Sequence, residues 1–115
     1  MKSPFLIPFL FAVGLFLNGC ETVMTGPSHL PGETVIDARG EKEVLEDIRW
    51  LDRAANKRDC PQIVKDTKRA GKEWDTIIEH WWVDSCGVVT VYKIRIAPQG
   101  GGTKYIVTFP RAGEI

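Results

Sequence analysis

The sequence has no excess of either charge and few histidines, and each shortage excludes a class of partner. Its 115 residues include 15 basic and 15 acidic side chains, so the composition gives no basic surface for the phosphates of a nucleic acid. The two histidines, His29 and His80, are far apart in the chain, and no third ligand follows at a recognisable spacing. We therefore expect no nucleic acid, no metal and no cofactor.

Enzyme motifs are also missing. His80, Asp84 and Ser85 invite comparison with a hydrolase triad, but on a strand residues four apart are separated by about 13 Å, too far for a hydrogen bond between His80 and Asp84. No nucleophile elbow surrounds the serine. The glycines of residues 100–102 follow a predicted strand without opening a helix, which favours a hairpin tip over a phosphate loop. We expect no catalytic residues and predict that the protein is not an enzyme.

The apolar run near the start of the sequence is short for a standard membrane span. Residues 5–17 form a run of thirteen residues without a charge, whereas a spanning helix needs about 20 apolar residues. A short positive start at Lys2 and this length are typical of a signal peptide. An uncleaved N-terminal helical anchor is the competing interpretation.

The residues that end this run resemble the lipobox of bacterial lipoproteins. Leu17, Gly19 and Cys20 fit that pattern, while Asn18 is more polar than the usual occupant. The resemblance implies that the chain is cut before Cys20, that its thiol is diacylated and that its new amino group is acylated. Several acyl chains hold a protein on a bilayer far more firmly than one. Glu21, where an aspartate could stand, implies the outer membrane of a Gram-negative envelope.

These features divide the chain into three parts. Residues 1–19 are predicted to be a signal peptide, residues 20–35 the lipidated cysteine and a flexible tether, and residues 36–115 a single periplasmic domain. Removing the leader leaves a chain long enough for one small domain. The twelve residues of the Gly- and Pro-bearing tract 21–32 could reach about 40 Å when fully extended.

Once Cys20 is assigned to lipid, Cys60 and Cys86 remain as a pair. In an oxidising periplasm we expect them to form a disulfide. A redox or metal pair is the alternative, but the spacing is not that of a Cys-x-x-Cys motif. Closing this loop should stabilise the fold by about 3.5 kcal/mol in the chain-entropy account.

A helix is predicted from about residue 40 to about residue 58. Its apolar stripe consists of Val44, Leu45, Ile48, Leu51 and Ala55. Acidic residues crowd its first turns and basic residues its last, which suits the helix dipole, and the residue at position 37 is an aspartate suited to the N-cap.

Trp50 falls on a flank of this helix, outside the stripe. We favour packing at the edge of the core, with an exposed contact residue as the alternative.

The rest of the chain is predicted to form a sheet. Residues 62–68 are a weak strand or a turn of helix, residues 70–72 a connection, and residues 76–84, 88–97 and 103–109 strands. The last two should form an antiparallel hairpin. The fold class is therefore α+β, with one N-terminal helix packed on a small antiparallel sheet of three or four strands and one disulfide.

Alternation in the strand 76–84 separates two neighbouring tryptophans. Trp81 is expected in the core and Trp82 on the opposite face, near His80 and Tyr105 or its neighbours. In the alternative, the helix covers the Trp82 side. An exposed aromatic on a sheet can anchor a partner, so Trp82, His80 and Trp50 are the candidate contact residues.

A second resemblance lies in residues 79–103. Glu79, Trp81, Val83, Cys86, Gly87, Tyr92, Pro98, Gly101, Gly102 and Thr103 follow a pattern similar to that of small uncharacterised Gram-negative envelope lipoproteins. That family implies a fold and no catalytic residues. We expect a non-enzymatic outer-membrane lipoprotein whose periplasmic domain binds a protein or another envelope component, with an envelope protein as the expected partner, and acts as a structural, assembly or accessory subunit. A periplasmic inhibitor of a cell-wall hydrolase such as lysozyme is the alternative, although such inhibitors are all-β and a helix is expected here.

Overall fold

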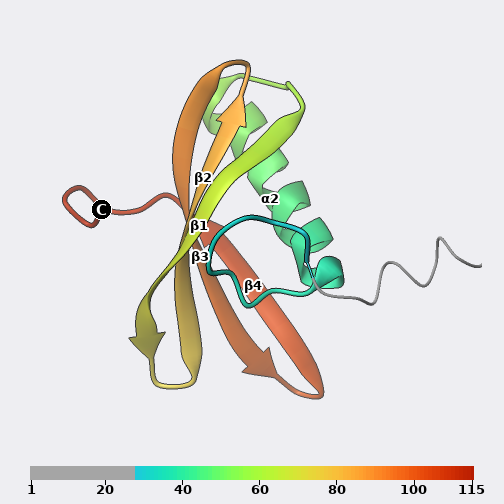
Figure 1. Ribbon diagram of the computed structural model, residues 1–115, viewed down its shortest axis with the longest axis vertical. Helices are drawn as coiled ribbons and strands as arrows, with labels where there is room; N and C mark the ends of the chain where they lie inside the picture. Colours follow the sequence, from blue (N-terminus) through green and yellow to red (C-terminus); the bar gives the residue numbers. More distant parts are fainter. Residues whose placement is uncertain (1–27) are drawn as a thin grey trace, which may run out of the picture.

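The protein folds as one helix packed on a four-stranded antiparallel sheet (Figure 1). The computed structural model describes residues 28–115. In chain order the elements are α2 (Ala38–Asn56), β1 (Gln62–Glu73), β2 (Thr76–Ser85), β3 (Val88–Gln99) and β4 (Gly102–Thr108). Each strand pairs with the next one along the chain, giving the order β1-β2-β3-β4. The predicted α+β class is confirmed, with four strands.

The predicted disulfide between Cys60 and Cys86 is present, with the two Cα atoms 5.3 Å apart. Cys60 lies between α2 and β1, and Cys86 lies in the turn between β2 and β3. The bridge therefore ties the C-terminal end of the helix to the central hairpin of the sheet.

Helix α2 begins and ends two residues earlier than the sequence predicted. Asp37 is the N-cap, as expected, and its Oδ1 accepts a hydrogen bond from the Gly40 N–H at 2.8 Å. The buried positions of the helix include Val44, Ile48 and Asp52, which follow one another at intervals of four. Ala55, predicted in the apolar stripe, is exposed. The buried face of the helix therefore includes Asp52, which the predicted stripe did not contain.

Strand β1 is longer than predicted. It runs from Gln62 to Glu73 and includes the segment 70–72, which the sequence analysis assigned to a connection. That prediction is wrong because pairing with β2 continues through the segment, with a register shift between Arg69 and Gly71. A register shift of this kind lets one strand contain an extra residue and twist more strongly while it stays paired with its neighbour. The turn that joins β1 to β2 lies at Trp74 and Asp75 instead.

The core lies between α2 and one face of the sheet. Trp81, Val83, Tyr92 and Ile94 point to this side and are at most 1% exposed. Burying a large apolar side chain contributes about 1.5–3 kcal/mol, so this layer is the main apolar contribution to stability. The prediction that Trp81 is in the core and Trp82 on the opposite face is confirmed.

The segment before α2 is bound to the sheet. The Glu33 N–H donates to the Thr67 carbonyl at 2.8 Å, and the Thr67 hydroxyl donates to the Pro31 carbonyl at 2.7 Å. Gly32 allows this approach, because a Cβ there would lie 2.1 Å from the Thr67 carbonyl oxygen. Leu30 packs against the core. The last residues of the expected tether, from Leu30 onward, are thus part of the folded unit.

Candidate functional site

The side of the sheet that faces away from α2, here called the open face, carries apolar side chains outside the core. Strand alternation and register place on it Ile63, Ile78, Trp82, Val89, Val91 and Ile106. Ile63 is 57% exposed, Val89 48% and Ile106 38%. Apolar side chains gathered on one exposed face mark a surface for a partner more often than scattered ones do.

A polar row divides these apolar residues into two groups. Lys68, His80, Lys93 and Thr108 lie side by side across the four strands. On one side of this row Trp82 is paired with Val91, and on the other Arg95 lies between Ile78 and Ile106. The open face therefore combines apolar surface with a polar centre.

His80 and Trp82 lie together on the open face, as predicted. Their rings are 6.3 Å apart and meet edge to face at 78°. His80 is buried, and its Nε2 has no hydrogen-bond partner. Tyr105 lies on the other face, against α2, whereas its neighbour Ile106 reaches the open face.

Trp50, the third candidate contact residue, is not part of this face. It is 68% exposed on the surface of α2, so the favoured interpretation of packing at the core edge is wrong.

Trp74 is a further exposed aromatic residue that sequence reasoning missed, and it is 96% exposed at the turn between β1 and β2. Its position between Glu73 and Asp75 was the available signal for an exposed turn.

The hydrolase-like residues do not assemble. The Ser85 hydroxyl is on the core side and donates to Asp52 Oδ2 at 2.7 Å. Asp84 is on the open face, where its Oδ1 accepts from the Gly87 N–H at 3.1 Å. His80 therefore has neither the serine nor the aspartate as a hydrogen-bond partner.

Asp52 is instead the centre of a buried polar network that sequence reasoning missed. Its Oδ1 accepts from Asn56 Nδ2 at 2.9 Å and from Arg58 Nε at 3.2 Å. Burial opposes ionisation, but hydrogen bonds from Asn56 and Ser85 and the charge of Arg58 keep the pKa of Asp52 below its usual 3.8. Burial, reinforced by the nearby Asp52 charge, raises the pKa of Tyr92 to about 12. The network joins the end of α2 to the sheet.

Glu79 is a second buried acid that serves the fold. It is 0% exposed, and its two oxygens accept from Trp81 Nε1 and from the Val35 N–H, each at 2.8 Å. This carboxylate connects the segment before α2 to the core tryptophan. A glutamate two residues before Trp81, on the same side of the strand, was the signal that could have identified it.

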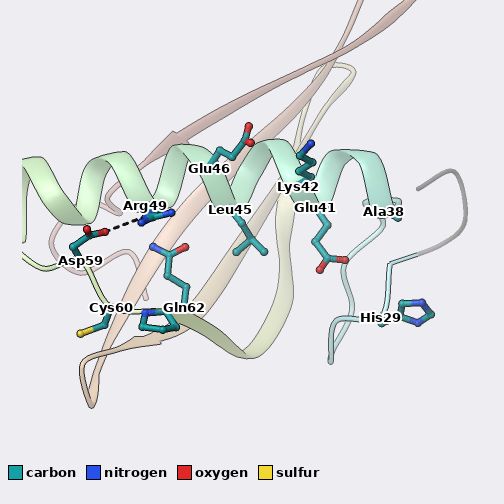
Figure 2. A pocket seen from close by; sticks show the side chains of 11 residues that line it. His29, Ala38, Glu41, Lys42, Leu45, Glu46, Arg49, Asp59, Cys60 and Gln62 are labelled. Carbon is teal, nitrogen blue, oxygen red and sulfur yellow. Dashed lines mark hydrogen bonds and ion pairs between the residues drawn. The ribbon is translucent and has the colours of Figure 1, made fainter. Parts of the chain in front are cut away.

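A groove of about 750 Å³ lies between α2 and the start of β1 (Figure 2). Leu45 points into it from the helix, and the Arg49–Asp59 ion pair, 3.1 Å long, bounds it on one side. With its amide oriented to match both groups, Gln62 donates to the Leu45 carbonyl at 3.2 Å and accepts from the Arg49 N–H at 3.1 Å. His29 also lines the groove, so the chain enters the folded domain on this side. The groove is lined largely by charged side chains of α2, and the ion pair at its edge is exposed to solvent, which makes the groove a weaker candidate than the open face.

Cys20 and the predicted leader lie outside the described residues. Within residues 28–115, no helix is both long and apolar enough to cross a membrane. The same span contains no group of three or more potential ligands that could hold a metal ion.

Comparisons with protein-family models, with curated proteins and with solved structures find no match to this chain.

Proposed function

We propose that this protein is a lipid-anchored component of the bacterial outer membrane whose folded domain binds an envelope protein through the open face and catalyses no reaction. The observation that carries the proposal is the exposure of Ile63 and Val89 beside the half-buried Trp82, with Ile106 exposed on the far side of the polar row. Aromatic side chains surrounded by smaller apolar ones supply most of the binding energy in many interfaces. Because α2 covers the other face, exposed apolar side chains of the sheet remain on this side.

The position of the anchor supports this use of the open face. His29 and Ala38 line the same groove, so the chain joins the domain beside the start of α2. Leu30, which packs on the core, is ten positions after Cys20; fully extended, this stretch reaches about 35 Å. The chain therefore enters the domain away from the open face, and a tether of this length leaves that face accessible to other envelope proteins.

Co-purification from solubilised envelopes tests the proposal. The intact protein should recover a stoichiometric envelope protein, a Trp82→Ala variant should lose it, and a Trp50→Ala variant should retain it. Trp50→Ala is a matched control because it removes the same side chain from the helix surface. Direct binding of the two purified proteins should show the same pattern. Recovery that Trp82→Ala leaves unchanged would contradict the proposal.

The identity of the recovered protein also separates the alternative role. A lysozyme-type enzyme that the purified domain inhibits would identify the chain as a hydrolase inhibitor. A structural or assembly protein without such activity would support an accessory role. In both cases Trp82→Ala is expected to weaken the complex, since truncating an aromatic anchor costs about 2 kcal/mol or more.

A further inference from the structure

The middle of the polar row, His80 and Lys93, is buried although α2 lies on the other side of the sheet. Lys93 is 4% exposed and His80 is 7% exposed. The C-terminal tail, residues 110–115, lies on the side of the sheet away from α2 (Figure 1). It contacts the row through Glu114, whose Oε2 pairs with Lys93 Nζ at 2.5 Å. The protein thus shields part of its own open face.

The tail holds the Glu114 carboxylate against Lys93 in the way that a bound peptide would. The Glu114 N–H donates to the Arg111 carbonyl at 3.0 Å, and Glu114 Oε1 accepts from the Arg111 N–H at 2.7 Å. This closed turn leaves Oε2 for the ammonium of Lys93. The hydrogen bond to Lys93 is the first cause that lowers the pKa of Glu114, to about 2. A carboxylate on a tight turn therefore occupies a receptor made by a buried cation.

His80 adds unused hydrogen-bonding capacity beside this contact. Among the buried side-chain polar atoms in the described part of the chain, its Nε2 is the one without a partner. His80 lies directly opposite Lys93 on the adjacent strand. Buried polar atoms are rarely left unpaired in folded proteins, and an exception calls for a role.

We propose that Lys93 and His80 form a receptor for an acidic peptide segment of the partner, and that the tail occupies this receptor through Glu114 until the partner displaces it. The partner's carboxylate would take the place of Glu114 on Lys93, with His80 Nε2 as a second contact. Trp82 on one side of the row and Ile106 on the other receive apolar side chains next to the acidic one. The inference rests on the proposed function and specifies the chemistry of the partner.

A tail held in the same molecule competes strongly with an external peptide. Short flexible connections give effective concentrations in the millimolar range, so a peptide binding in trans must overcome that advantage. Removing the tail should therefore raise the apparent affinity for an acidic peptide.

An NMR titration with a synthetic tail peptide tests this inference. The probe is the peptide of residues 110–115, acetylated and amidated so that Glu114 supplies its only carboxylate. A protein shortened to end at Phe109 should bind the probe at least tenfold more tightly than the full chain does. The same probe with Glu114→Gln should bind at least tenfold more weakly. Equal affinity of the two probes for the shortened protein, or no binding by it, would overturn the proposal.

Two full-length variants guard against a shortened protein that fails to fold. Glu114→Gln keeps the tail but removes its charge, so this variant should bind the probe more tightly than the wild type. Adding Lys93→Met to the Glu114→Gln variant should abolish this gain in affinity for the probe. If neither variant changes probe binding while Trp82→Ala still abolishes partner capture, the receptor proposal fails and the proposed function stands.

Discussion

Replacing Asp52 by alanine should destabilise the fold more than replacing an exposed acid, because Asp52 connects three parts of the molecule. It lies on α2, accepts from Ser85 at the end of β2, and pairs with Arg58 beyond the helix. Arg58 in turn donates to Thr90 of β3 at 2.9 Å. Alanine would leave the buried Ser85 hydroxyl without its acceptor and Arg58 without its counter-ion.

The size of the effect follows from the burial of the two partners. Breaking a buried ion pair by removing one member costs about 3–5 kcal/mol. The Arg58 side chain is 22% exposed, so water offsets part of this loss. We therefore expect Asp52→Ala to lower the free energy of unfolding by about 2–4 kcal/mol. For a domain of this size that lowers Tm by roughly 10–25 °C.

Urea unfolding of the oxidised protein measures this difference, with Asp59→Ala as the control. Asp59 pairs with Arg49 on the surface, where their side chains are 52% and 59% exposed, and an exposed pair is worth under about 1 kcal/mol. A loss below about 1 kcal/mol for Asp52→Ala, or equal losses for the two variants, would refute the reasoning.

The lowered pKa of Asp52 gives this contribution a pH dependence of defined sign. The folded-state pKa lies below the usual 3.8, so acid protonates the unfolded chain first and favours it. The stabilisation from Asp52 is complete above about pH 3.8 and is lost as pH falls through the folded-state pKa. Urea midpoints of the wild type should therefore fall more steeply below this pH than those of Asp52→Asn. Parallel curves for the two proteins would contradict the assignment.

Three further perturbations test the fold and the anchor. Replacing Cys60 and Cys86 together by serine should lower the free energy of unfolding by about 3.5 kcal/mol; an unchanged urea midpoint would contradict a stabilising bridge. Gly40→Ala places a Cβ 2.5 Å from the Tyr105 hydroxyl and should cost about 1–3 kcal/mol despite the better helix propensity of alanine. A Tm equal to that of wild type would disprove that clash. Cys20→Ser should release the protein from membranes with its leader uncut, as measured by fractionation and lipid labelling; a lipid-labelled, membrane-bound product would refute the anchor.

Sequence alternation predicted the two faces of the sheet because period two is a geometric property of any strand. It separated Trp81 from Trp82 and placed His80 with Trp82. The same rule could have identified Glu79 as buried, since it shares the side of Trp81. Asp52 was also within reach, because it continues the series of Val44 and Ile48 at intervals of four.

Other features depend on tertiary contacts that local patterns do not contain. The segment 70–72 has the composition of a turn, but pairing with β2 holds it in a strand through a register shift. The exposure of Trp50 depends on how α2 is rotated over the sheet. The pairing of Lys93 with Glu114 joins residues on a strand and in the tail, and no periodicity connects the two.

Site-specific photo-crosslinking in intact cells tests the central claim most directly. A photoreactive residue placed at Ile63 or Ile106, both exposed on the open face, should crosslink to a single envelope protein, whereas one at Trp50 on α2 should not. Crosslinks to that protein from Trp50 alone, with none from the open face, would show that binding uses the helix surface and would contradict the account.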